Sequence, residues 1–364
     1  MKKLIILLLF IPITSFGQVN EITINKIYNL SVKWGEERIN KLYDDMVYYD
    51  LFNRDLYLYQ DDFSLLVRGK KFWEEIKVDY KLIDDLYKRA KTKGYKKAYA
   101  EFRKLLNDNE EVIEDNYNYL KNIIRKMFVE KEAYILTNSA DKNLKKVIIN
   151  LANHYKKNKK STFFKMIDGV PNFHRIINKK ITKKYSLFAI KHSFYFYNWN
   201  IKTKLEKKLK DGVYKHWRYV KLLAGNSKKR FEKNIPSDGQ IDRLQIVRYP
   251  AGGGELRDHV DPKKNQRVVS GIIMSKIGED FKSGGFYFKS SKNKKINIEK
   301  NLNEGDAVIF YGSIAHGVEK VDPKEKLSWK INKGRWFIGM FVNDSDHIKN
   351  RVTARDLTGS VKKY

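Results

Sequence analysis

The fold is decided by the stretch Leu256-Arg257-Asp258-His259-Val260-Asp261-Pro262. Side chains alternate between the two faces of an extended strand, so His259 and Asp261 point to the same face. A distant histidine, His316, can complete a set of two imidazoles and one carboxylate. Such a set binds a metal ion on one side and leaves coordination positions open on the other. The stretch is therefore a candidate half of a metal site.

Several further motifs stand around this stretch in a fixed order. They are Tyr249-Pro250-Ala251-Gly252-Gly253-Gly254, an apolar strand led by Arg267, Ser283-Gly284-Gly285-Phe286-Tyr287-Phe288, Gly305-Asp306-Ala307, His316-Gly317-Val318 and a strand that contains Arg335. A His-x-Asp pair occurs by chance, but the ordered set is specific. From about Ile241 to Val342 the chain resembles the Fe(II)/2-oxoglutarate-dependent dioxygenases. The resemblance covers a little over a quarter of the chain.

The resemblance implies a metal centre and two co-substrates. It assigns His259, Asp261 and His316 as the ligands of Fe(II), with 2-oxoglutarate and dioxygen as co-substrates. Family members that halogenate usually lack the carboxylate, so Asp261 favours hydroxylation, or a related desaturation or ring-forming oxidation.

The resemblance also implies roles outside the metal set. Arg335 is expected to bind the 5-carboxylate of 2-oxoglutarate, because a guanidinium forms a planar, bidentate pair with a carboxylate. Tyr249 is expected to donate a hydrogen bond to the co-substrate, with plain packing as the alternative. Arg267 is expected to bind substrate or to pair with an acid. Phe337 and Phe341 stand where two branches of the family carry serine and a second arginine, so both branches match poorly.

The fold class expected is α+β, with a helical region followed by a double-stranded β-helix, or jelly roll. Short runs of strand-forming residues separated by glycine-rich turns predict the jelly roll. The predicted strands are 241–249, 268–275, 285–289, 295–298, 307–311, 317–321 and 336–342. Residues 185–199 hold one or two more strands, and 201–223 form a helix that is interrupted near Gly212.

The expected domain order has four parts. Residues 1–18 read as a Sec-type signal peptide, with Lys2 and Lys3 before a short apolar run and small residues before Gln18. Residues 19–160 are helical, since apolar residues recur there at spacings of three and four, as in Leu144, Ile148 and Leu151. The oxygenase jelly roll spans 161–345 with its core at 241–342, and 346–364 form a tail. We expect an exported protein, periplasmic or secreted, without a membrane span after the leader.

Composition limits the remaining possibilities. The chain has no cysteine, which excludes disulfides, thiolate nucleophiles and iron–sulfur clusters. The formal net charge is +31, and residues 156–235 hold 23 Lys and Arg against 4 Asp and Glu. A solvated basic surface accounts for this excess; attraction of an anionic surface or substrate is the alternative. No nucleic-acid-binding motif is recognisable, so nucleic acid is not an expected partner.

The substrate stays open at this point. A small molecule is the first expectation, and a peptide or protein side chain is the second. A third hypothesis is a jelly roll that binds a metal or ligand without turnover, although the complete ligand set with its arginine argues against it.

Overall fold

The computed structural model describes residues 65–68, 126–127, 131–224, 226, 229–262, 266–290 and 294–358. The expected signal peptide and most of the expected helical region lie outside these residues. The chain divides into two compact units, and every described residue belongs to the unit of 46–72 and 125–364. Among the described residues, no helix combines the length and apolar character that crossing a membrane requires.

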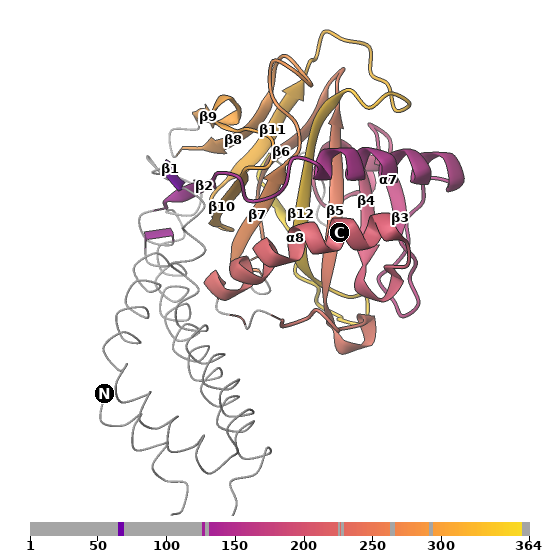
Figure 1. Cartoon of the computed structure of the whole chain (residues 1–364). Helices are drawn as coiled ribbons and strands as arrows, with labels where there is room; N and C mark the ends of the chain where they lie inside the picture. Colours follow the sequence, from indigo (N-terminus) through magenta and orange to yellow (C-terminus); the bar gives the residue numbers. More distant parts are fainter. Residues whose placement is uncertain are drawn as a thin grey trace, which may run out of the picture. The chain divides into compact units, whose positions relative to one another are not determined.

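Two antiparallel sheets curl against each other in this unit (Figure 1). The larger sheet has the order β1-β2-β10-β7-β12-β5-β4-β3, in which only β1 and β2 are parallel. Its strands are β1 Leu65–Arg68, β2 Ala133–Leu136, β3 Phe173–Ile177, β4 Ala189–Tyr197, β5 Gln240–Pro250, β7 Val268–Ile273, β10 Ala307–Tyr311 and β12 Gly334–Asp344.

The smaller sheet faces the inner side of the larger one. It consists of β6 Gly254–Val260, β8 Gly285–Lys289, β9 Lys295–Asn297, β11 His316–Val321 and β13 Arg355–Asp356. Strand β4 pairs with both β5 and β6, so the two sheets join along this edge into a half-barrel. The predicted jelly roll is confirmed.

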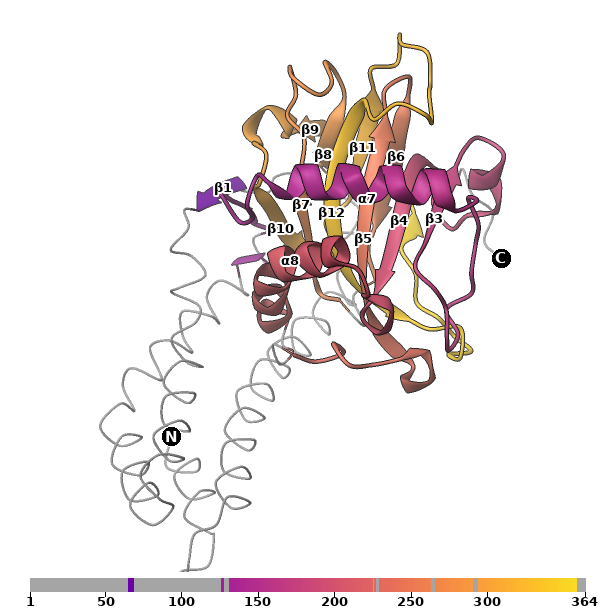
Figure 2. The ribbon, with the colours of Figure 1, turned by 45° about the vertical axis from the view of Figure 1, so that its right-hand side comes forward.

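The outer face of the larger sheet is covered by two helices, α7 Leu144–Asn158 and α8 Lys204–Leu223 (Figures 1 and 2). Short 3₁₀ turns lie at Ile181–Lys184, Asn198–Asn200, Pro236–Asp238 and Glu299–Asn301. Leu144, Ile148 and Leu151 are buried on α7, as the spacing predicted. Strand β4 is buried along its whole length, because helices cover the outer face of the larger sheet and the smaller sheet lies on its inner side.

Helix α8 runs without a break through Gly212, so the predicted interruption is wrong. A Cβ atom at position 212 would lie 2.7 Å from Cδ2 of Leu144 on α7. The glycine therefore lets the two helices approach closely, and does not end either one.

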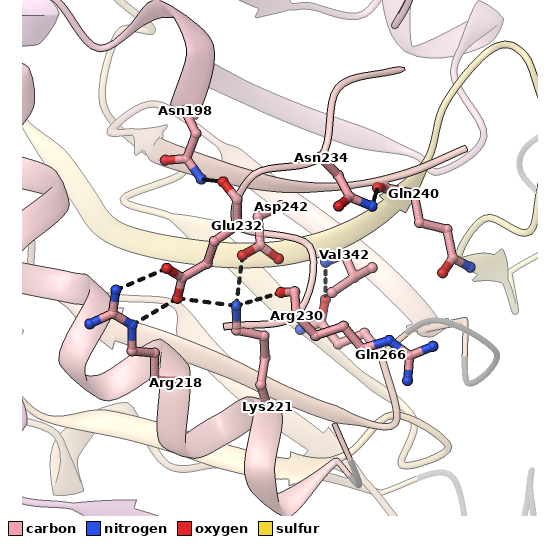
Figure 3. A network of polar contacts seen from close by, with 10 residues as sticks. All are labelled: Asn198, Arg218, Lys221, Arg230, Glu232, Asn234, Gln240, Asp242, Gln266 and Val342. Atoms are coloured by element: carbon pink, nitrogen blue, oxygen red, sulfur yellow. Dashed lines mark hydrogen bonds and ion pairs between the residues drawn. The ribbon is translucent and has the colours of Figure 1, made fainter. Parts of the chain in front are cut away.

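Charged side chains fasten α8 to the neighbouring loop and to β5 (Figure 3). The Nζ of Lys221 lies 2.8 Å from Oδ2 of Asp242 on β5, and Arg218 forms a two-bonded pair with Glu232. Lys221 also donates to the carbonyl of Arg230 at 2.8 Å. This paired network fixes the helix over the sheet.

The sequence-based boundaries differ from the structure in places. Strands β1 and β2 and helix α7 lie before residue 161 but belong to the same compact unit as the jelly roll. Long-range pairing explains β2, because its partners β1 and β10 come from distant parts of the chain. Strand β3 was not predicted, and β6 was expected only as the extended strand of His259 and Asp261. The strands predicted after residue 240 are confirmed with small shifts at their ends.

Candidate metal centre and active site

The three predicted metal ligands meet where β6 and β11 pair. His316 lies directly opposite His259 in this antiparallel register. Asp261 follows β6, and its backbone N–H donates to the carbonyl of Gly312 at 2.9 Å. The Nε2 of His316 lies 3.3 Å from Oδ2 of Asp261, and the Nε2 of His259 lies 3.9 Å from Oδ1. One ligand atom from each residue falls within 4.8 Å of the others, close enough to share one ion.

Both imidazoles are held in the tautomer that a metal requires. The Nδ1–H of His259 donates to the carbonyl of Arg257 at 2.9 Å, and that of His316 donates to the carbonyl of Ile314 at 2.8 Å. A carbonyl only accepts, so the proton of each neutral ring sits on Nδ1. The Nε2 lone pairs are then free to coordinate, as is usual for metal-binding histidines.

Charge states in the site also suit a cation. Burial, with a smaller contribution from the neighbouring His316, lowers the pKa of His259 to about 4. Burial alone would raise the pKa of Asp261, but the contact with His316 and the neighbouring positive charges lower it overall. A neutral His259 beside an ionised Asp261 is the protonation state that metal binding needs.

A glycine next to the second histidine makes room for a support under the site. A Cβ atom at Gly317 would lie 2.5 Å from the hydroxyl of Tyr287 on β8. Tyr287 crosses β11 at this point and donates to Asp258, which also pairs with Lys289. The bridge from β6 to β8 holds β11 between them, and therefore fixes the position of His316.

Arg335 is buried at the start of β12, with 1% of its surface exposed. Its Nε donates to Oε2 of Glu299 at 2.8 Å, while its Nη2 is buried and has no hydrogen-bond partner among the described residues. Tyr249 lies directly across on β5 and stacks on Phe337, with ring centroids 6.0 Å apart. One edge of the guanidinium is thus held by a carboxylate and a second nitrogen remains for a ligand.

One cavity of about 440 Å³ joins these groups. Its walls include the three metal ligands, Arg335 and Tyr249, together with apolar side chains such as Phe286 and Phe310. Small-molecule sites range over roughly 300–1,000 Å³, so the cavity is of the size that a co-substrate and a small substrate need. Arg267 precedes β7, and its side chain is not among those that line the cavity.

Sequence reasoning missed four charged residues of this region. Glu299, the partner of Arg335, lies in a 3₁₀ turn, and Arg175, Lys191 and Arg243 line the cavity from β3, β4 and β5. The only local signal was a cation within a run of strand-forming residues, as in the segments 173–177 and 189–197. Such a cation usually indicates a solvent-facing position.

No family model matches the chain, and no curated protein is similar to it at a significant level. Solved structures with a similar backbone include a Pseudomonas putida prolyl-4-hydroxylase at 9% identity and a TM-score of 0.35, covering 61% of this chain and 97% of that one. A Burkholderia pseudomallei oxidoreductase of the 2OG-Fe(II) oxygenase family has 11% identity and a TM-score of 0.35, covering 64% and 93%. A Trichoplax adhaerens prolyl hydroxylase in complex with a hypoxia-inducible-factor peptide has 12% identity and a TM-score of 0.35, covering 66% and 92%. These likenesses are low, and the functional argument therefore rests on the residues of the site.

Proposed function

We propose that the protein is an Fe(II)- and 2-oxoglutarate-dependent oxygenase that hydroxylates a C–H bond of a small molecule. The observation that carries the proposal is the buried set of His259, Asp261 and His316 in one cavity with the unpartnered Nη2 of Arg335. Two imidazoles and one carboxylate are the donor set of non-heme Fe(II) oxygenases. When bound, iron with the co-substrates 2-oxoglutarate and dioxygen would supply the oxidative decarboxylation to succinate and carbon dioxide, one oxygen atom of dioxygen entering succinate and the other the hydroxylated product.

The chain's own residues have three tasks in this scheme. His259, Asp261 and His316 would hold the ion at the wall of the cavity. Arg335 orients the co-substrate through a charge-assisted pair with its distal carboxylate. Apolar walls exclude water from the reacting centre, which strengthens every electrostatic contact inside it.

A small substrate is supported by the size of the cavity, about 440 Å³. The competing substrate is a peptide side chain. Incubation of the iron-loaded protein with metabolites and with peptides separates the two, since hydroxylation adds one oxygen atom to whichever is modified.

The test of the oxygenase proposal is anaerobic titration of Fe(II)-loaded protein with 2-oxoglutarate, followed by its visible charge-transfer band. We expect a band in the wild type, no band in His316→Ala and an affinity at least about tenfold weaker in Arg335→Ala. Arg335→Lys keeps the positive charge but loses the planar guanidinium. Its affinity for 2-oxoglutarate should therefore lie between those of the wild type and Arg335→Ala. His347→Ala is the matched histidine control, because His347 is exposed and pairs with Asp168. A folded wild type without the band contradicts the proposal.

A further inference from the structure

Three cations besides Arg335 line the cavity from strands of the larger sheet. Antiparallel register places Arg175 of β3, Lys191 of β4 and Arg243 of β5 on the inner face of the larger sheet. The residues of these strands that line the cavity are all odd-numbered, Tyr195 among them, as expected for one face of each strand. Arg243 and Tyr249 are six residues apart on β5, roughly 20 Å along the strand. Arg243 therefore lies far from Arg335, whereas Lys191 is level with Tyr249, because the next pair along is His192 with Arg248. The rings of Tyr185 and Tyr195 link the three cations, since Arg175 lies near both rings, Lys191 near the first and Arg243 near the second.

The cluster has no counter-charges in the part of the chain that the structure describes, and Arg175 and Lys191 are buried while Arg243 is half-buried. Arg175 and Lys191 are each 7% exposed. The Nε atoms of Arg175 and Arg243 and the hydroxyl of Tyr195 are buried without a hydrogen-bond partner among the described residues. No described carboxylate forms an ion pair with any of the three cations, and their polar contact is Arg243 Nη2 donating to Oε1 of Gln245 at 3.3 Å.

Aromatic rings hold the cations in place. The guanidinium carbons of Arg175 and Arg243 lie 5.5 and 5.1 Å from the centroid of the Tyr195 ring, and the Nζ of Lys191 lies 5.7 Å from that of Tyr185. A cation–π contact offsets only part of the lost hydration of a buried cation. Burial accordingly lowers the pKa of Lys191, and the charges of Arg243 and Arg175 lower it further.

The two carboxylates in the cavity wall have other partners. Asp346 pairs with Arg351 and accepts from the backbone N–H of Met166. Asp261 contacts both histidines of the metal set and interacts with Lys191 only over a longer range. This end of the cavity therefore has an excess of positive charge, and it lies beside the metal set.

We propose that Arg175, Lys191, Arg243 and the hydroxyl of Tyr195 bind an anionic group, a carboxylate, phosphate or sulfate, on the primary substrate. The assignment of this anionic group to a substrate rests on the proposed function. Two planar guanidinium groups, one ammonium group and a phenol hydroxyl together supply several hydrogen-bond donors to one oxyanion. An anion held there leaves the rest of a small substrate to extend toward His259, Asp261 and His316.

The test is calorimetric titration of the metal-free full-length protein with inorganic phosphate, with sulfate and with acetate. We expect one of these anions to bind, and its identity assigns the class of the anionic group. Binding should weaken at least about tenfold in Lys191→Met and in Arg243→Met. It should stay unchanged in His316→Ala, in Arg335→Ala and in Lys215→Met, which removes an exposed lysine of α8.

Absence of binding by all three anions in the wild type overturns the proposal, and so does equal binding in both cluster variants. Methionine keeps the length of the lysine and removes its charge, so Lys191→Met is expected to fold; circular dichroism checks this. The charge-transfer band with 2-oxoglutarate should persist in Lys191→Met. If the wild type binds the anion but shows no band, the oxygenase proposal alone is refuted. If it shows the band but binds none of the anions, the anion subsite alone is refuted.

Discussion

Two lysines of the same half-barrel are buried in opposite ways. Lys221 on α8 is 1% exposed and lies 2.8 Å from Asp242 and 3.5 Å from Glu232 (Figure 3). Lys191 on β4 is 7% exposed and has no ion-pair partner among the described residues. Strand β5 serves both sites with consecutive residues, since Asp242 faces the helix and Arg243 faces the cavity.

This difference distinguishes a buried charge that stabilises the fold, that of Lys221, from one that is available to a ligand, that of Lys191. A buried ion is tolerated when a counter-ion and hydrogen bonds replace its lost water, as they do around Lys221. Around Lys191 that replacement is missing, so the folded protein is less stable than its core would allow. Such deficits are typical of binding sites, where stability is lost for the sake of function.

The largest effect is expected from breaking the paired site. Lys221→Met leaves Asp242 buried without a cation and removes a contact of Glu232. We expect unfolding free energy to fall by about 3–5 kcal/mol, as when one partner of a buried pair is deleted. Urea unfolding measures the change, with Lys215→Met as the exposed control. A loss below about 1 kcal/mol would show that the pair behaves like a surface pair and would remove the contrast.

Arg335 is intermediate between the two lysines, and Glu299→Gln moves it toward the unpaired state. Oε2 of Glu299 accepts from Nε of Arg335 and from the backbone N–H of Phe286. Bonds to charged groups contribute about 1.5–3 kcal/mol, so we expect a loss of about 2 kcal/mol in urea unfolding. Affinity for 2-oxoglutarate should rise, because no carboxylate then competes for the guanidinium. Glu325→Gln, which breaks a partly exposed pair with Lys333, is the control, and equal losses in both variants would contradict the prediction.

The metal set could be predicted from the sequence because its information is local. His259 and Asp261 are two residues apart at the end of β6, and His316 lies beside a glycine that the Tyr287 crossing requires. The later strands were equally accessible, since each is a short apolar run between turn residues.

The cation cluster could not be predicted in the same way. Arg175, Lys191 and Arg243 are brought to one cavity wall by the pairing of β3, β4 and β5, and pairing over such distances leaves no mark on local sequence. Strand β2 was missed for a similar reason. In the structure, Lys131 and Asn138 near its ends have left-handed φ angles of 54° each. The excess of basic residues in 156–235 was interpreted first as a solvated surface, with an anionic surface or substrate as the alternative, and it did not show which of its cations are buried.

Neutralising Lys191 should raise the free energy of unfolding, whereas Lys221→Met should lower it. Lys191→Met replaces an ammonium that lacks a counter-ion with an apolar side chain of similar length. Exchanges of buried ions for well-packed apolar groups are often neutral or stabilising, and we expect a gain of about 1 kcal/mol in urea unfolding. A loss of more than about 1 kcal/mol would mean that Lys191 has a structural partner, and the two lysines would then not differ in kind.

The smallest effect is a pH slope that compares the wild type with Lys191→Met. Burial lowers the pKa of Lys191 below its ordinary value of 10.5, so the folded protein binds fewer protons there than the unfolded chain does. The wild type should therefore gain stability relative to the variant as pH rises toward 10.5, and lose it as pH falls. The slope cannot exceed that of one proton, about 1.4 kcal/mol per pH unit.

Arg175 of β3, Tyr195 of β4, Arg243 of β5 and Asp261 after β6 all influence this titration, and all four are present in both proteins. The difference between the two urea-unfolding curves consequently isolates Lys191. Saturating the cluster with the anion that binds it should flatten the slope, because a bound anion returns the pKa of the lysine toward its ordinary value. A slope that the anion leaves unchanged would mean that Lys191 lies outside the anion subsite.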